Sequence, residues 1–500
     1  MRRATPGLGV VFALLAAGVL GACGDDDVRP SLDAARVDAG PVDAAGLDAA
    51  RVDSGAVDAA RPDAAGIDAA APPDGGGGPT VLAEAVCVGD ETSGHVAVSP
   101  DGARVAYVTC EPAGGHVWTM SLPAGAPVEL GPGDAATTVE FSPDGMHVVF
   151  GSAGAFFVRA ADGSAAAVRL TTGTIEEHRF IRREDRTTPG VFHTTLLARA
   201  LDGADRRIVS RSADDGYAGE VVIASDPAAD LTGNLTLVST NGQKLVFERF
   251  TFLQYHEVPT DLVAAPSFLP WSSTTTQMLA DGLTDVDGIG FEGDRLVFRT
   301  FDGSVDVDLA AAVLPSHEPF VHGGFVYFVA DGDPTRRERS ATAAPAQVLA
   351  TATAIDMVPV PDRSRAVCLS AGTIFSVATD ASGPPVQIIA TAGAVTRLVG
   401  AFSPDSTQML ALVGDGLRRT DVAVAGTEVL VDDVSVSASS IGFNGAGTRA
   451  VWRKADVLRG ASAGGSPATL TTGVTGWWSV PRASGILYLT ATGQLVADAG

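Results

Sequence analysis

One serine in the chain has the spacing of a hydrolase nucleophile. The segment from Gly460 to Gly464 reads Gly-x-Ser-x-Gly around Ser462, a pattern that places a serine on a sharp turn between a strand and a helix. Here the serine lies among small residues and between two predicted strands, and no helix is predicted after it. Because the chain contains 58 glycines, this spacing can arise by chance. We therefore expect no catalytic residue.

A second segment has part of the spacing of a metal site. Asp285, Asp287 and Gly288 would begin a calcium-binding loop, but the third regularly spaced oxygen ligand is missing. The eight histidines are scattered singly, and His147 falls inside a predicted strand. The sequence contains no HExxH, no CxxC and no phosphate-binding loop. We expect no metal site and no cofactor.

The first residues of the chain are typical of an export signal. Arg2 and Arg3 supply a positive start, and the run from Leu8 to Leu20 is apolar. This run is shorter than the roughly 20 apolar residues that cross a bilayer. We expect residues 1–22 to be a signal sequence that is removed.

The end of this signal resembles the lipobox of bacterial lipoproteins. It reads Leu20, Gly21, Ala22 and Cys23, and the thiol of such a cysteine receives a diacylglyceryl group before cleavage. The resemblance implies lipid attachment at Cys23 and membrane association through that lipid. Gly24 follows the cysteine, so the aspartate that retains some lipoproteins in the inner membrane is absent from that position. We expect an outer-membrane lipoprotein that faces the periplasm or the cell surface.

Export determines which states are expected for the other three cysteines. Cys87 and Cys110 are the only close pair, and an oxidising compartment permits a disulfide between them. Two reduced, buried thiols are the alternative. Cys368 lies in the apolar run Ala366 to Leu369, where a cysteine usually behaves as a small buried hydrophobe.

Residues 23–79 form a low-complexity tract. An aspartate recurs every five residues from Asp33 to Asp68, and a period of five gathers one face on neither a helix nor a strand. We expect a disordered linker with a root-mean-square span of roughly 40 Å or more. A pentapeptide-repeat β-helix is the alternative, but its central position needs a bulkier residue than alanine.

The charge balance limits the partners of the chain. Acidic residues number 59 and basic residues 34, which gives a formal net charge of -25. Nucleic acids and anionic lipid surfaces both require a basic footprint. We expect neither of them as a partner.

From residue 80 onward the sequence is typical of an all-β fold with an internal repeat. Val96 to Ala106 reads VAVSPDGARVA, and Val139 to Val149 reads VEFSPDGMHVV. Related segments begin at Val360 and Gly400, and four weaker copies end at Phe247, Phe298, Trp452 and Leu489. A period near 40 residues with a hairpin in each unit predicts a β-propeller.

The residues of the repeated turn have physical roles. A serine can bond back to the backbone, proline and aspartate favour the central positions, and glycine accepts the left-handed conformation. The flanking strands are apolar at successive positions, so both their faces should be buried between neighbouring units. The adjacent Trp477 and Trp478 should likewise point to opposite faces. These SPDG hairpins resemble the repeats of the TolB-like family of β-propellers, which are related to WD repeats.

About ten hairpin units can be counted in residues 80–500, including one placed only by spacing between Thr174 and Asp230. They could form one large ring or two smaller rings, or some of the hairpins could be insertions. The last unit has three strands, near Trp478, Ile486 and Leu495, while Thr80 to Ala85 is a strand without a unit. Pairing the orphan strand with the last unit would remove two exposed edges.

Two functions are compatible with this organisation. Resemblance to TolB-like propellers implies interaction in the cell envelope, so we expect a lipid-anchored, non-catalytic scaffold that binds a protein or peptide. The alternative is a propeller enzyme, a lyase or hydrolase that acts on an extracytoplasmic polysaccharide or peptide.

Overall fold

The computed structural model describes most of the chain from residue 78 to residue 499. The described residues are 78–89, 93–112, 114–152, 155–170, 173–185, 188, 190–231, 235, 237–238, 242–249, 252–257, 267–272, 276–281, 285–292, 295–299, 306–310, 319–339, 345–370, 372–390, 398, 400–413, 416–432 and 440–499. The predicted signal sequence lies outside them, and so does the predicted linker up to residue 77.

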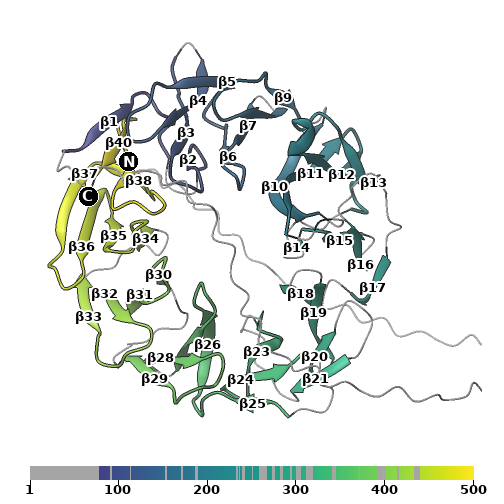
Figure 1. The fold of residues 1–500 in the computed structure, drawn as a ribbon, viewed down its shortest axis with the longest axis vertical. Helices are drawn as coiled ribbons and strands as arrows, with labels where there is room; N and C mark the ends of the chain where they lie inside the picture. Colours follow the sequence, from purple (N-terminus) through teal and green to yellow (C-terminus); the bar gives the residue numbers. More distant parts are fainter. Residues whose placement is uncertain are drawn as a thin grey trace, which may run out of the picture. The chain divides into compact units, whose positions relative to one another are not determined.

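The described residues form ten four-stranded antiparallel sheets, which we call blades 1 to 10 (Figure 1). Blades 1 to 3 contain β2 (Val96–Val98), β3 (Arg104–Val108), β4 (Gly115–Ser121), β5 (Val128–Gly133); β6 (Val139–Phe141), β7 (His147–Ser152), β8 (Ala155–Ala160), β9 (Val168–Arg169); and β10 (Thr174–Glu184), β11 (Phe192–Asp202), β12 (Asp205–Ser212), β13 (Val221–Pro227). Blades 4 to 6 contain β14 (Leu237–Val238), β15 (Lys244–Arg249), β16 (Phe252–Glu257), β17 (Ser267–Ser272); β18 (Thr276–Asp281), β19 (Asp285–Glu292), β20 (Arg295–Arg299), β21 (Asp306–Ala310); and β22 (Phe320–His322), β23 (Phe325–Ala330), β24 (Asp333–Glu338), β25 (Gln347–Val348).

Blades 7 to 9 contain β26 (Ala354–Pro359), β27 (Arg365–Ser370), β28 (Thr373–Ala378), β29 (Val386–Ile389); β30 (Gly400–Phe402), β31 (Gln408–Val413), β32 (Gly416–Asp421), β33 (Val429–Asp432); and β34 (Ile441–Phe443), β35 (Arg449–Lys454), β36 (Val457–Ser462), β37 (Ala468–Thr472). Blade 10 contains β38 (Val474–Ser479), β39 (Ile486–Thr490), β40 (Leu495–Asp498) and the first strand of the chain, β1 (Thr80–Ala83). The 3-10 helix η1 (Ala213–Asp215) lies between β12 and β13. In the described part of the chain, no helix is long and apolar enough to cross a membrane.

Apolar side chains hold neighbouring blades together because each middle strand buries both of its faces. Ala106 and Val108 of β3 pack toward blade 2, whereas Val105 and Tyr107 pack toward blade 10. Similar clusters join the other neighbours, and β14 lies beside β18 where blades 4 and 5 meet. The ten blades therefore close into one ring, and the alternative of two smaller rings is wrong.

The fold is an all-β propeller, as the repeat predicted. Trp477 contributes to the cluster shared with blade 9, and Trp478 packs against the cluster shared with blade 1. The tryptophans thus face opposite neighbours, as expected. The stretch placed only by spacing forms blade 3, whose first two strands have 11 residues each.

The first strand of the chain closes the ring. Strand β1 pairs with β40, so that Thr80 lies opposite Ala497 and Ala83 opposite Leu495. This confirms the expected pairing of the orphan strand with the last unit. One blade is thereby built from both ends of the propeller, which makes the closure depend on the fold of the whole ring.

Candidate functional site

The repeated turns form the most regular polar feature of the described residues. In the first copy, the hydroxyl of Ser99 accepts a hydrogen bond from the Arg104 amide at 2.9 Å and donates one to Asp101 Oδ1 at 2.6 Å. Gly102 follows with φ +74°, the left-handed conformation expected for this position. The second and third copies repeat the serine to aspartate bond at Asp144 and Asp405.

These aspartates are held in their charged form by the turn. Burial alone would raise the pKa of Asp101, but hydrogen bonds from Ser99 and from the Ala103 amide outweigh it and lower the pKa. Asp405 has a lowered pKa for the same reason, with the Ser403 hydroxyl as the main cause. Carboxylate oxygens used in this way stabilise hairpins.

Neighbouring turns also contact one another around the ring. Thr194 of blade 3 donates to Asp144 Oδ2 of blade 2 at 2.9 Å. The Asp362 amide of blade 7 donates to the Ser406 hydroxyl of blade 8 at 3.1 Å, and the Asn444 side-chain amide of blade 9 donates to the carbonyl of Ser484 in blade 10 at 2.8 Å. We call this side of the propeller, defined by the turns between the first and second strands, the turn face.

The closure region contains the cysteine pair. Cys87 and Cys110 form a disulfide with their Cα atoms 4.9 Å apart. The Cys87 amide donates to the carbonyl of Val108, and the Cys110 amide donates to the carbonyl of Ala85, each at 2.8 Å. The segment that leaves β1 is therefore bound to blade 1 both covalently and through the backbone.

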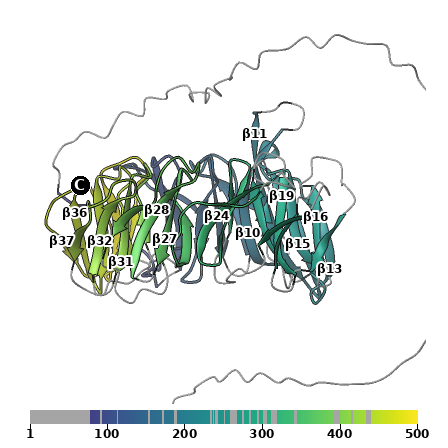
Figure 2. The same ribbon diagram turned by 90° about the horizontal axis from the view of Figure 1, so that it is seen from below.

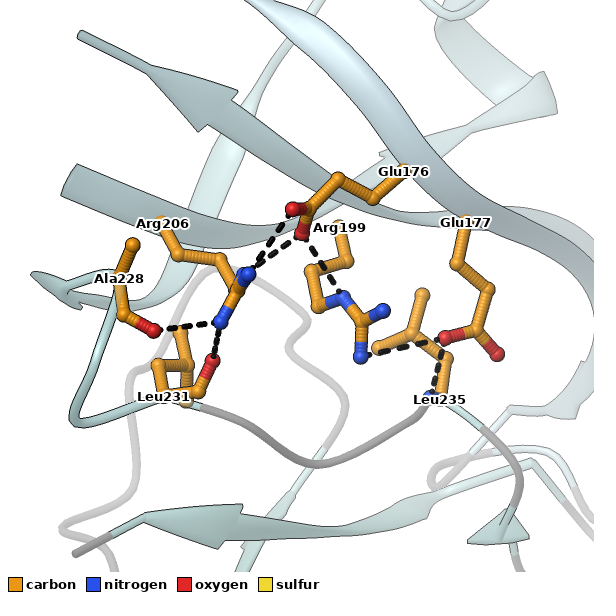
Figure 3. Close-up of polar contacts among 7 residues, drawn as sticks. All are labelled: Glu176, Glu177, Arg199, Arg206, Ala228, Leu231 and Leu235. Atoms are coloured by element: carbon orange, nitrogen blue, oxygen red, sulfur yellow. Dashed lines mark hydrogen bonds and ion pairs between the residues drawn. The ribbon is translucent and has the colours of Figure 1, made fainter. Parts of the chain in front are cut away.

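Two glutamates and two arginines form a charged cluster in blade 3 (Figure 3). Arg206 forms a two-point contact with Glu176, through Nε to Oε2 at 2.6 Å and Nη2 to Oε1 at 2.9 Å. Arg199 Nε reaches the same Oε2 at 3.2 Å, and Arg199 Nη1 lies 3.5 Å from Glu177 Oε2. The hydrogen bond from Arg206 is the main reason why the pKa of Glu176 is lowered.

This charged cluster also binds three backbone groups of described residues between blades 3 and 4. Arg206 Nη1 donates to the carbonyls of Ala228 and Leu231 at 2.5 and 2.6 Å, and the Leu235 amide donates to Glu177 Oε2 at 3.0 Å. The charges of Arg206 and Glu176 therefore compensate each other. Arg206 also positions the backbone through its bonds to the two carbonyl groups. Such an arrangement stabilises a blade junction and offers no general acid or base.

The strands β10 and β11 extend the turn face. Figure 2 shows β11 rising beyond the strands of the other blades. Phe192, the first residue of β11, is 37% exposed, and Val191 just before the strand is 43% exposed. Arg182 lies over the Phe192 ring at 4.8 Å from its centroid. We call Val191 and Phe192 the hairpin tip. Aromatic residues and arginine are enriched in protein contact surfaces.

The residues singled out for chemistry are not gathered into one place. Ser462 ends β36 with its side chain exposed, and a turn to another strand follows, as the sequence indicated. Asp285 and Asp287 lie in β19, an extended strand paired with β18, so the backbone of that segment is not a calcium loop. No group of three or more His, Cys, Asp or Glu side chains within the described ranges is placed to hold a metal ion.

The remaining candidates are structural or lie outside the described residues. Cys368 is fully buried and unpaired, and burial raises the pKa of its thiol. His147 begins β7 as expected, and burial lowers its pKa although Asp144 opposes this. Cys23 lies outside the described residues.

Glu176, Arg206 and the hairpin tip were not predicted from the sequence. The one available signal was the density of arginine between residues 179 and 211, which interrupts an otherwise acidic chain. The polar partners of Glu176 and Arg206 lie 22 to 30 residues away along the chain, so the contacts could not be inferred from local spacing.

The chain was compared with protein families, curated proteins and solved structures. No protein-family model matches the chain, and no curated protein matches it. A crystal structure of a eukaryotic initiation factor is 12% identical with a TM-score of 0.45, over 77% of this chain and 90% of that one. The β-propeller domain of Cps50 (Swd1) from Myceliophteria thermophila is 11% identical with a TM-score of 0.32, over 85% and 99%. The WD40 domain of SCAP from fission yeast is 8% identical with a TM-score of 0.36, over 84% and 96%.

Proposed function

We propose that this chain is a lipid-anchored envelope protein whose propeller is a non-catalytic scaffold for a protein or peptide. The observation that carries the proposal is the hairpin tip on the turn face, where Val191 and Phe192 are exposed beside Arg182. Aromatic and arginine side chains provide most of the binding energy in protein interfaces. The polar groups of the neighbouring turns are already bonded to one another, which suits a rigid support.

A binding comparison tests the scaffold. The full-length protein with Phe192→Ser is compared with Val348→Ser, a change of another exposed apolar residue, 51% exposed on the outer strand β25. Both variants are used as bait in detergent extracts of the native envelope. We expect Phe192→Ser to lose the partner that the unchanged protein recovers, and Val348→Ser to keep it. Equal recovery by both variants would argue against the hairpin tip as the binding surface.

The enzyme alternative has one sequence feature in its favour, the Gly-x-Ser-x-Gly segment. Ser462 is exposed in a hairpin between β36 and β37, and no helix begins there to supply the amide groups of an oxyanion hole. Ser462→Ala should therefore leave every property of the protein unchanged. Loss of a hydrolytic activity on an envelope polysaccharide or peptide in this variant would establish the enzyme instead.

We further propose that Cys23 carries the lipid and that the protein resides in the outer membrane. The lipobox and the apolar run before it support the first statement, and Gly24 supports the second. Two or three acyl chains hold a protein far more firmly than one, at about 0.8 kcal/mol per buried methylene. Cys23→Ala should release a folded propeller from the membrane fraction. Retention of processed variant protein in membranes would contradict the anchor, and recovery of the unchanged protein at inner-membrane density would contradict the sorting.

A further inference from the structure

The first strand of the propeller is also the strand that closes it. Strand β1 is the outer strand of blade 10, and its one neighbour in that sheet is β40 (Figure 1). Thr80 and Val81 are exposed, and the register with β40 is interrupted between Val81 and Ala83. Any tension carried by the residues before β1 reaches this strand first. Its release breaks a single strand pairing.

The segment after β1 is attached on both sides of the closure. Val86 and Cys87 are 2% and 1% exposed. The Val86 amide donates to the carbonyl of Gly493 in blade 10 at 2.8 Å, and the disulfide joins Cys87 to Cys110 in blade 1. Cys110 is exposed, so a soluble dithiol can reach the disulfide from that side.

The disulfide changes the covalent path along which tension travels through blade 1. Without the bond, the path follows the chain from Cys87 through β2 and β3 to β4. With the bond, the path passes from Cys87 through the two sulfur atoms to Cys110 and directly on to β4. Strand β2 has three residues and pairs with β3 alone, so it would be the next strand to detach. The disulfide therefore leaves the β2–β3 hairpin outside the path of tension.

The β2–β3 hairpin carries contacts that close the ring. Val105 and Tyr107 of β3 are 0% and 3% exposed and pack in one cluster with apolar side chains of blade 10. In the turn of the hairpin, a Cβ on Gly102 would lie 2.6 Å from the carbonyl oxygen of Pro481. Loss of this hairpin would open the ring between its first and last blades.

We propose that the disulfide between Cys87 and Cys110 is a load-bearing clamp. Tension that enters through the N-terminus detaches β1 but passes around the β2–β3 hairpin, so the ring stays closed. This inference rests on the proposed lipid anchor, which would supply the tension when the membrane and a bound partner move apart. A clamp differs from the general stabilisation that a disulfide provides by restricting the unfolded chain, because a clamp acts only on tension that passes through it.

Single-molecule pulling on the full-length mature protein tests the clamp. One handle is joined to the N-terminus in place of the lipid, and the other to an azide-bearing residue at position 348, an exposed site on β25. With the disulfide intact, the first release should end at Cys87 and yield about 25 Å of chain, at roughly 3.5 Å per residue. After reduction by a soluble dithiol, it should extend from β1 to the start of β4 and yield about 120 Å.

A second pulling axis separates the clamp from general stabilisation. Handles at position 348 and at Gly500 keep both cysteines out of the covalent path, so reduction should leave the opening force on this axis unchanged. Cys87→Ala combined with Cys110→Ala should reproduce the reduced protein on both axes without any reductant. A first release of the same length before and after reduction, or equal weakening on both axes, would overturn the clamp. Because the handles supply the tension, failure of the lipid anchor would appear in the fractionation of Cys23→Ala and not in this measurement.

Discussion

Two glycines in equivalent turns provide a matched test of ring closure. Gly102 in blade 1 and Gly145 in blade 2 have φ values of +74° and +71°, so an alanine is strained equally at both. A Cβ at Gly102 would lie 2.6 Å from the carbonyl oxygen of Pro481 in blade 10, whereas a Cβ at Gly145 would have its nearest neighbour, Ser99 Cβ, at 3.6 Å. The two changes therefore differ in one respect, the contact between the first and last blades.

The expected losses follow from these distances. A left-handed alanine costs about 1–2 kcal/mol, and the stiffer unfolded chain returns about 0.4–1 kcal/mol. Gly145→Ala should therefore lower the free energy of unfolding by about 1 kcal/mol. Gly102→Ala should lower it by a further ~1–3 kcal/mol, the usual cost of forcing extra atoms into a packed site.

Equilibrium unfolding in urea, followed by tryptophan fluorescence, measures both losses. The slope against denaturant must be the same for the two variants, so that the midpoints compare directly. Equal losses within about 0.5 kcal/mol would mean that the turn of blade 1 does not pack on blade 10, and the closed ring would be refuted.

Three further changes test other parts of the account. Arg482 has a left-handed backbone conformation in its turn, with φ +64°, so Arg482→Gly should raise the free energy of unfolding by about 0.5–1 kcal/mol while Arg482→Ala does not. The urea midpoints of the two variants decide this. Replacing Cys87 and Cys110 by alanine should lower the free energy of unfolding by about 3 kcal/mol, because the disulfide closes a loop across 23 residues. Mass mapping of unreduced peptides from the envelope must first find the two cysteines joined. Free thiols at both positions would reject the disulfide. Asp432 is 5% exposed and accepts hydrogen bonds from Trp452 Nε1 at 2.8 Å and Arg459 Nη1 at 2.5 Å. Asp432→Ala should lower the free energy of unfolding by about 2–3 kcal/mol, and Asp432→Asn should lower it by less. Equal losses in thermal unfolding would argue against a stabilising role for the Asp432 charge.

The repeat made the architecture predictable because the turn carries its own geometry. Serine, proline, aspartate and glycine determine the hairpin locally, so the copies at Ser99 and Ser142 identified units without knowledge of their neighbours. The unpaired strand at Thr80 and the three-stranded last unit then indicated closure. The number of rings could not be predicted, since it depends on the small rotation between packed blades, which no local pattern records.

The candidate site was harder to predict for a related reason. The strands around Glu176 and Phe192 lack the SPDG turn, so this unit was placed only by its spacing. The ion pairs of its charged cluster join residues on three strands, and a pairing such as Glu176 with Arg206 exists only once the register of β10, β11 and β12 is set.

Photo-crosslinking in intact cells is the most direct test of the proposed scaffold. A photoreactive residue is placed at Phe192 on the turn face or at Val348 on an outer strand of the full-length, lipid-anchored protein. We predict one discrete crosslinked species from position 192 and none from position 348, and we predict that the species from position 192 is lost with Cys23→Ala because the propeller is no longer held at the membrane. The same crosslinks from both positions, or none from position 192 with the anchor intact, would contradict a scaffold that binds through this face.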